Sequence, residues 1–222
     1  MASRIAALVL TIPALAFCAQ RVEVTTTEKA DFAPGGTVRI EHSVGELNIE
    51  GWDQPTVQIE AVRYTFSDHP EQAKALLAKV GIMKELKGTE LTISTAHKRY
   101  TWAHVDYRIH VPRNTNLVVR HGIGDVTIYD VSGNIDADAR TGDVVVQLPE
   151  PAKYQIDARA GFGSIYSDFD GVRHSHLPHL KTNETLKIAT EGTGEARQIH
   201  LHVSRGGVTI EKAAPLPLLS SK

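Results

Sequence analysis

The sequence predicts an all-β protein: a solenoid-like stack of short strands joined by glycine bends, with one short amphipathic helix. Three observations support this fold class. Apolar and polar residues alternate over many short segments, glycines recur between those segments, and one strand–bend–strand pattern repeats in a constant register. Alternation with a period of two places apolar side chains on one face of a strand. An antiparallel β-sandwich also has short strands at regular spacing, and it stays open as the alternative architecture.

The repeated pattern is clearest over residues 117–128, where a strand, a glycine bend and a second strand follow one another. It recurs 18 residues later, then 21 and 43 residues further on, and once 79 residues earlier. Glycine suits a bend because it adopts positive φ without a steric penalty. A unit of about 20 residues cannot bury its apolar face alone, so neighbouring units must stack. The aligned positions 38, 117, 135, 156 and 199 are therefore expected to form one column. The bend glycines are Gly45, Gly124, Gly142, Gly163 and Gly206.

Two segments interrupt the repeat. Residues 68–80 have apolar side chains at helical spacing, with Asp68 as the expected N-cap and Gly81 as the stop. A polar stretch at about 168–195, punctuated by Pro and Gly, is expected to be a long surface loop. Two further segments, 91–96 and 105–112, are predicted to be strands.

Composition bounds the class of protein. The chain has 222 residues, of which 41% are hydrophobic, and a formal net charge of -2. These values are typical of a globular protein rather than a disordered one. They leave no basic footprint for nucleic acid. Cys18 is the only cysteine, so disulfides, thiol nucleophiles and zinc–thiolate sites are excluded from the rest of the chain.

The N-terminal segment predicts export. Residues 1–19 contain Arg4, an apolar run too short to span a bilayer, and a small-residue exit, which is typical of a secretory signal peptide. Residues 20–222 are then expected to form a single extracytoplasmic domain, periplasmic, cell-surface or secreted, without a transmembrane span. Cys18 lies where a lipoprotein would be acylated, but Phe17 stands where a small residue is expected. Lipid anchoring through Cys18 is thus the less favoured alternative.

Several segments together resemble a known family. They are "IEGWDQPTVQIEA", "YRIHVPRNTNLVV", the successive turns at Gly124, Gly142 and Gly163, "GSIYSDF", and "IHLHVSRGGVTIEK". In these segments, over residues 36–212, the chain resembles the bacterial putative-adhesin family of β-strand-repeat domains of unknown function. The resemblance implies an extracytoplasmic repetitive β domain and provides no catalytic residues to transfer. The histidine-bearing stretch after Phe169 departs from a minimal member.

Two patterns raise the question of metal binding. Gly122–Asp125 resembles the glycine–aspartate turns of calcium-binding β-rolls, but later units carry Ser164 and Gly207 instead of aspartate. Solvated turn aspartates are therefore preferred over calcium ligands. His174, His176 and His179 are close enough in sequence to share zinc or copper. No carboxylate at fixed spacing completes that set, so a flexible polar loop is preferred. His200 and His202 are expected to lie on a solvated strand face.

The segment "KRYTWAHVDY" is the remaining candidate site. If Tyr107 points inward, then Trp102 and His104 point outward, where aromatic rings suit contact with sugar or protein, as would Tyr100 nearby. Packing beneath the helix at 68–80 is the preferred interpretation. The chain contains neither a Gly-x-Ser-x-Gly elbow nor a phosphate-binding loop followed by a helix.

These observations predict a function only in outline. We expect an exported, non-enzymatic β-repeat scaffold that is adhesin-like or acts as an envelope interaction domain, with a glycan or protein as its unknown ligand. No catalytic, cofactor-binding or metal-binding residue is assigned. The first alternative is a polysaccharide-binding or polysaccharide-acting module, which an aligned acidic cluster on one outer face would favour. The second is a periplasmic metal-binding protein that uses the histidine loop. Open strand edges make self-association possible.

Overall fold

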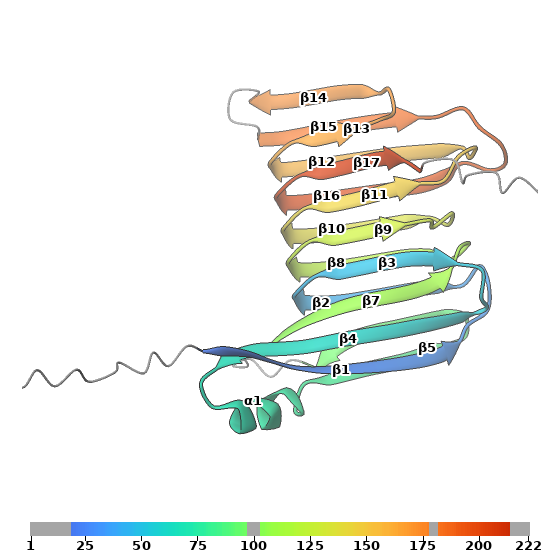
Figure 1. The fold of residues 1–222 in the computed structure, drawn as a ribbon. Helices are drawn as coiled ribbons and strands as arrows, with labels where there is room; N and C mark the ends of the chain where they lie inside the picture. The colour runs from blue at the N-terminus through green and yellow to red at the C-terminus, as the bar shows by residue number, and fades with distance from the viewer. Residues whose placement is uncertain (1–18, 97–102, 178–181, 214–222) are drawn as a thin grey trace, which may run out of the picture.

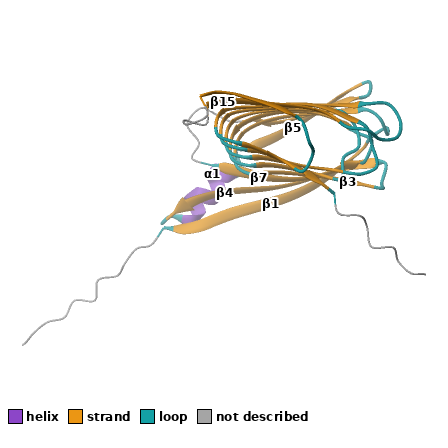
Figure 2. Ribbon diagram, turned by 90° about the horizontal axis from the view of Figure 1, so that it is seen from above, coloured by secondary structure: helices purple, strands orange, loops and turns teal. Residues whose placement is uncertain are grey.

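The structure, a computed structural model, describes residues 19–96, 103–177 and 182–213. Two open β-sheets pack face to face around one hydrophobic core (Figures 1 and 2). The prediction of an all-β chain is confirmed. In spatial order, sheet A consists of β1 (Gln20–Asp31), β4 (Thr56–Ser67), β7 (His104–Pro112), β3 (Leu47–Trp52), β9 (Val126–Tyr129), β11 (Val144–Leu148), β17 (Val208–Lys212) and β13 (Ile165–Ser167). Sheet B consists of β14 (Val172–Leu177), β15 (Thr182–Ala189), β12 (Tyr154–Phe162), β16 (Arg197–Arg205), β10 (Ile135–Thr141), β8 (Asn116–Ile123), β2 (Thr37–Val44), β6 (Glu90–Ala96) and β5 (Gly81–Lys87).

The middle of both sheets is parallel and is built from the five predicted units. Each unit sends one strand to sheet B, turns at its glycine, and sends the next strand to sheet A. Leu117 is paired with Val38 on one side and with Ile135 on the other. Ile199 continues the row from Ile135 and leads to Ile156. The predicted column is thus confirmed, strand by strand.

The spatial order of the units differs from their order in the chain. The fifth unit, β16–β17, lies between the third, β10–β11, and the fourth, β12–β13 (Figure 1). After β13 the chain forms β14 and β15 beyond β12, then returns and inserts β16 between β10 and β12. Because the five units share one register, each could pair with any of the others, and the repeat pattern alone does not predict their spatial order.

Antiparallel pairs occur at both ends of sheet B and at one end of sheet A, which makes the sheets mixed. Strands β1, β4 and β7 pair antiparallel at one end of sheet A, and β5 pairs antiparallel with β6. At the other end β12, β15 and β14 are antiparallel in sheet B. The two open sheets face one another as in the sandwich alternative, but they are mixed rather than wholly antiparallel. The solenoid-like stack stays a prediction. The expectation of a loop over residues 168–195 was wrong, because β14 and β15 form a hairpin there.

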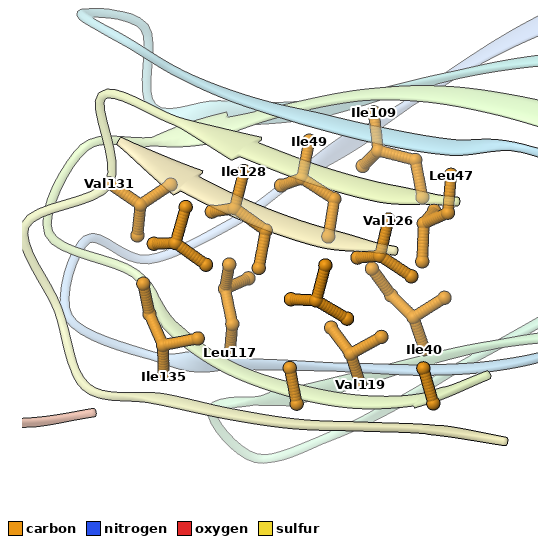
Figure 3. Close-up of a cluster of buried hydrophobic side chains, with 14 of the residues drawn as sticks. Ile40, Leu47, Ile49, Ile109, Leu117, Val119, Val126, Ile128, Val131 and Ile135 are labelled. Carbon is orange, nitrogen blue, oxygen red and sulfur yellow. The ribbon is translucent and has the colours of Figure 1, made fainter. Parts of the chain in front are cut away.

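The core is made of the inward-facing residues of both sheets (Figure 3). Four small residues are fully buried on the inner side of sheet B: Ala137, Ala139, Ala158 and Ala160. The bends of successive units also lie in close contact. A Cβ atom on Gly142, whose φ is +128°, would lie 2.0 Å from the carbonyl oxygen of Gly124. The close approach of successive bends therefore requires glycine.

The helix α1 (Pro70–Leu77) closes one end of the sandwich, where it contacts β1 and β4 (Figure 2). It buries Ala73 and Leu77, as the helical spacing predicted. Its N-cap is His69 rather than Asp68, and no side chain caps the first turn. Pro70 fixes the first turn instead, because its ring presets a helical φ and lacks an N–H that would need a partner. Within the described part of the chain, no helix combines the length and apolarity that a membrane span requires.

Candidate functional site: the polar face of sheet B

The outer surface of sheet B carries a compact set of charged side chains. We call it the polar face and define it as Asp136, Asp138, Asp157, Arg159, His200 and His202. Their inward neighbours Ala137, Ala158 and Leu201 are buried, so alternation along β10, β12 and β16 places the charged residues outside.

Parallel register arranges the polar face in two rows across three strands. Asp136, His200 and Asp157 lie side by side in the first row. Asp138, His202 and Arg159 form the second row, two residues further along each strand. Neighbouring strands are about 4.8 Å apart, so adjacent side chains in a row are within contact distance. Each histidine therefore has a charged neighbour on both sides.

The polar face is hollowed. A depression of about 230 Å³ is lined by all six residues together with Ala137 and Leu201. A second depression, of about 430 Å³, adjoins it and shares Asp157 and His200. Its lining is less charged and includes Val172 and Ile188 from the β14–β15 hairpin. A ligand on this surface would therefore contact charged groups on one side and an apolar strip on the other.

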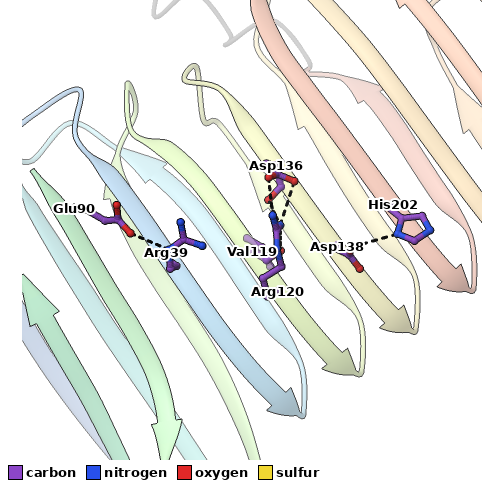
Figure 4. A network of polar contacts seen from close by, with 7 residues as sticks. All are labelled: Arg39, Glu90, Val119, Arg120, Asp136, Asp138 and His202. Carbon is purple, nitrogen blue, oxygen red and sulfur yellow. Dashed lines mark hydrogen bonds and ion pairs between the residues drawn. The ribbon is translucent and has the colours of Figure 1, made fainter.

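Ion pairs hold the charged side chains in place. The guanidinium of Arg159 donates to both carboxylate oxygens of Asp157, at 3.1 and 3.0 Å. These hydrogen bonds lower the pKa of Asp157 and raise that of Arg159. Arg120 on the neighbouring strand makes an equivalent two-pronged contact with Asp136, at 3.1 and 2.7 Å (Figure 4). The two guanidinium groups thus orient both carboxylates, as recognition of a polar ligand requires.

The second row is held more loosely. His202 Nδ1 lies 3.3 Å from a carboxylate oxygen of Asp138, and both side chains are about half exposed (Figure 4). The prediction that His200 and His202 lie on an exposed strand face is confirmed. Within the described ranges, no three His, Cys, Asp or Glu side chains are arranged to hold a metal ion.

The bend aspartates have a structural role that the sequence did not reveal. Asp125 Oδ1 accepts the backbone N–H of Asp143 at 2.9 Å, and Asp143 Oδ1 accepts the N–H of Gly207 at 2.7 Å. At the first bend, Asp106 Oδ1 likewise accepts the N–H of Glu46 at 2.9 Å. Asp125 and Asp143 therefore each link one unit to the next, and Asp106 links β7 to the bend of the first unit. The expectation that they are merely solvated was incomplete, and they do not converge on a common cation position.

The histidine-rich segment lies apart from the polar face rows. His174 is exposed on β14, in the hairpin that replaces the expected loop. The backbone of His176 belongs to the same strand, whereas its side chain and all of His179 lie outside the described residues. A shared metal site of these three histidines stays a prediction.

The aromatic candidates are only partly described. Tyr107 points inward and is 1% exposed, as predicted. His104 lies on the outer face of sheet A, where its ring stacks on Tyr64 at 5.1 Å with an interplanar angle of 15°. The preferred interpretation, packing beneath the helix, was wrong for His104, because the neighbouring ring comes from β4. Tyr100 and Trp102 lie outside the described residues, as do residues 1–18 with the expected signal peptide and Cys18.

Sequence reasoning identified His200 and His202 but missed their acidic neighbours. Asp136, Asp157 and His200 are far apart in sequence, at successive intervals of 21 and 43 residues. These are the same intervals that relate the repeated units. Aligning the outward positions of the units, as well as the inward ones, would therefore have brought the polar face together.

Comparison with known proteins supports the fold and leaves the function open. No family model matches this chain, and no curated protein matches it. A solved structure of a putative cell adhesion protein from Clostridium sporogenes matches with a TM-score of 0.51 and 12% sequence identity. That match covers 86% of this chain and 100% of the other. The fold of this chain is similar to that of a bacterial putative cell adhesion protein.

Two further solved structures are putative adhesins. The one from Bacteroides fragilis has a TM-score of 0.32 and 11% identity, and it covers 86% of this chain and 97% of its own. The one from Parabacteroides merdae has a TM-score of 0.28 and 9% identity, over 87% of this chain and 97% of its own. The resemblance that the sequence predicted therefore holds at the level of the fold, through the Clostridium structure.

Proposed function

We propose that this chain is an exported, non-enzymatic interaction domain, adhesin-like in role, which binds an envelope or cell-surface ligand through the polar face of sheet B. The observation that carries the proposal is the pair of in-register rows, in which acidic, imidazole and guanidinium groups alternate on a rigid surface. The likeness in fold to a putative cell adhesion protein supports it. Rigid strands suit this role because they hold the ligand-binding groups in place before binding.

The charge state of the polar face favours binding over hydrolysis. A carboxyl pair that hydrolyses glycosidic bonds needs one member with a raised pKa, so that it can act as a general acid. Here the hydrogen bonds from Arg159 lower the pKa of Asp157. Asp136 is held by a two-pronged contact with Arg120. Both carboxylates are therefore arranged as hydrogen-bond acceptors for hydroxyl or amide groups of a ligand.

A polysaccharide-binding module is the second candidate. The aligned carboxylates Asp136, Asp138 and Asp157 on one outer face favour it. Asp136 and Asp157 lie in the first row on either side of His200, two strand separations of about 4.8 Å each apart, and such recurring acceptors suit a ligand that repeats its hydroxyl groups. The five units would then act as a solenoid-like stack, with the extended surface that such stacks use for binding.

The first experiment tests export. The chain is expressed in a bacterial host with a C-terminal tag, and the cells are fractionated into cytoplasm, periplasm, membrane and medium. We expect the tagged chain outside the cytoplasm and shortened at its N-terminus by the removal of residues 1–19 or a nearby segment. Full-length chain confined to the cytoplasm would exclude an exported domain.

The second experiment tests the ligand-binding surface. The purified chain is applied to an array of bacterial and host-surface glycans and to envelope proteins, and hits are compared with the variants D157N and H200Q. D157N removes a negative charge and H200Q removes an imidazole, and both keep a side chain of similar size on the polar face. E211Q is the matched control, since Glu211 lies on β17 in the other sheet. We expect the two polar-face variants to weaken binding and E211Q to leave it unchanged. Equal binding by all three variants would exclude the polar face.

The third experiment separates the alternatives. Release of reducing ends from the bound glycan would identify an enzyme rather than a binding domain. Calorimetric titration with zinc or copper tests the histidine-rich segment. Binding tighter than about millimolar that H174Q abolishes would favour the metal-binding alternative. We expect neither result.

A further inference from the structure

Besides the two depressions on the polar face, sheet B has a groove at the edge where its strands reach the glycine bends. We call it the rim groove. It has a volume of about 520 Å³ and lies two to three residues beyond the second row of the polar face. It is lined by Ile123, Arg140, Thr141, Phe162, Ser204 and Arg205.

Parallel register also builds this groove. Ile123, Thr141, Arg205 and Phe162 occupy one row, contributed by β8, β10, β16 and β12 in that order. Four strands about 4.8 Å apart give the row a length of about 14 Å. The sequence order of these residues is different, because the fifth unit is inserted between the third and the fourth. The insertion is therefore what places Arg205 next to Phe162.

The groove presents side chains rather than backbone to a ligand. The carbonyl oxygens of Thr141, Arg205 and Phe162 each accept the N–H of a bend glycine in the neighbouring unit, at 2.8–3.0 Å. These acceptors are already used by the stack. The groups that remain for a ligand are two guanidinium groups, two hydroxyl groups and two apolar side chains.

The two arginines give the groove a positive charge. Arg140 and Arg205 are exposed, and neither forms an ion pair with any residue in the described ranges. Arg120 and Arg159, nearer the middle of the same face, are instead neutralised by aspartate. No carboxylate is among the residues that line the rim groove. The rim groove therefore suits a negatively charged ligand.

The apolar side chains restrict the anion further. Phe162 is 65% exposed and Ile123 is 44% exposed, at opposite ends of the row. An exposed aromatic ring on a rigid strand stacks well on the apolar face of a sugar ring. The hydroxyl groups of Thr141 and Ser204 lie among the arginines and suit hydroxyl-rich ligands.

We propose that the rim groove binds a short stretch of acidic polysaccharide, with sugar carboxylates paired to Arg140 and Arg205 and one sugar ring stacked on Phe162. This goes beyond the proposed function, on which it rests, by naming a second site and its ligand class. A length of about 14 Å accommodates roughly three sugar units, matched to the strand spacing.

The test is calorimetric titration of the full chain with a galacturonate trimer, and with a neutral galactose trimer for comparison. We expect binding of the acidic trimer and binding of the neutral trimer that is about tenfold weaker or more. R140Q and R205Q should each weaken acidic-trimer binding about tenfold, because each removes a charge-assisted contact. F162A should weaken binding of both trimers. R120Q is the matched control and should leave acidic-trimer binding unchanged. Circular dichroism confirms that the variants fold.

Four results would overturn the proposal. They are no binding of the acidic trimer at millimolar concentration, equal binding of the neutral trimer, binding of inorganic phosphate as tight as that of the acidic trimer, and tighter binding of laurate lost in the same variants. The last two would indicate a general anion site and a lipid site. Failure of the proposed function is distinguishable, because D157N and H200Q alter the polar face and should not affect binding of the acidic trimer in the rim groove.

Discussion

The Nδ1 atoms of His42 and His121 lie 3.1 Å apart in the interior, where both side chains are 5% exposed. The two residues occupy the same position in neighbouring units and are directly paired across β2 and β8. A hydrogen bond between two imidazoles requires one nitrogen to donate and the other to accept. If both imidazoles were protonated, neither Nδ1 atom could accept a hydrogen bond, and two positive charges would lie side by side. The ring of Tyr107, 4.9 Å from His42, closes the site.

The histidine pair predicts a loss of stability in acid. Burial lowers the pKa of His121 from its ordinary value of 6.5. Below that value the unfolded chain takes up a proton that the folded chain resists. The stabilisation is therefore complete above about pH 6.5 and is lost as the pH falls through the lower folded-state pKa. Urea unfolding between about pH 7.5 and pH 5 measures this.

The matched variants for this prediction are H121L and H200Q. We expect the free energy of unfolding of H121L to depend less steeply on pH than that of the parent chain, whatever its absolute value. H200Q changes an exposed histidine and should keep the parent slope. Identical slopes for the parent and H121L would show that the buried pair does not control acid stability.

The bend aspartates predict a second effect on stability, independent of calcium. D143A removes the acceptor for the N–H of Gly207 at the junction between the third and fifth units. We expect a loss of about 1–2 kcal/mol in the free energy of unfolding, the value of a hydrogen bond to a charged group with an unsatisfied donor left behind. D143N keeps a side-chain oxygen and should lose less. Calcium or a chelator should leave the melting temperature of the parent unchanged, and a rise with calcium would contradict the structural role.

The bend glycines predict a third effect on stability. G142A introduces a Cβ atom 2.0 Å from the carbonyl oxygen of Gly124, at a φ of +128° that side chains rarely adopt. Both units must move apart, so we expect a loss of at least about 3 kcal/mol. G88A is the control, since Gly88 has a φ of +61° and no atom within 4 Å of its Cβ position. It should cost about 1 kcal/mol from backbone strain alone. Equal losses in denaturant unfolding would contradict the close-packing argument.

The inward register was predictable from sequence because alternation and glycine spacing are local signals. Two other features of the fold could not be predicted from such local signals. The insertion of the fifth unit is a choice among equivalent neighbours, and nothing in residues 197–212 marks it. The β14–β15 hairpin was hidden because buried positions on β15 include the polar residues Thr182 and Glu184 as well as Leu186 and Ile188. A strand whose buried face is half polar gives a weak alternation pattern.

The polar face was equally hidden, for a related reason. Its members come from strands that are adjacent only after the fifth unit is inserted, so no local motif contains them. His200 and His202 were noticed because they are close in sequence. Asp136 and Asp157 became neighbours of His200 only through the fold.

The polar residues hidden in the hairpin protect a sheet edge. Strand β13 is the last in sheet A, and no other strand of the described residues pairs with its outer edge. Glu184 accepts the N–H of Ile165 at 3.1 Å, while Arg173 donates to the carbonyl oxygen of Ile165 at 2.5 Å. Arg173 and Glu184 also form an ion pair with one another. Two side chains of sheet B thus occupy the positions that an added strand would take, so we expect them to hinder pairing with a second copy at this edge.

This arrangement predicts the outcome of substitutions at the pair. E184A frees the N–H of Ile165 and leaves Arg173 without its carboxylate, so we expect faster hydrogen exchange at Ile165 and a loss of about 2 kcal/mol. R173M should cost less, because Arg173 is 46% exposed and Glu184 still accepts the N–H. The E184A variant should also associate at high concentration in sedimentation experiments, since its edge strand can then pair with a second copy. A monomeric E184A with unchanged exchange at Ile165 would show that the short length of β13 is sufficient protection by itself.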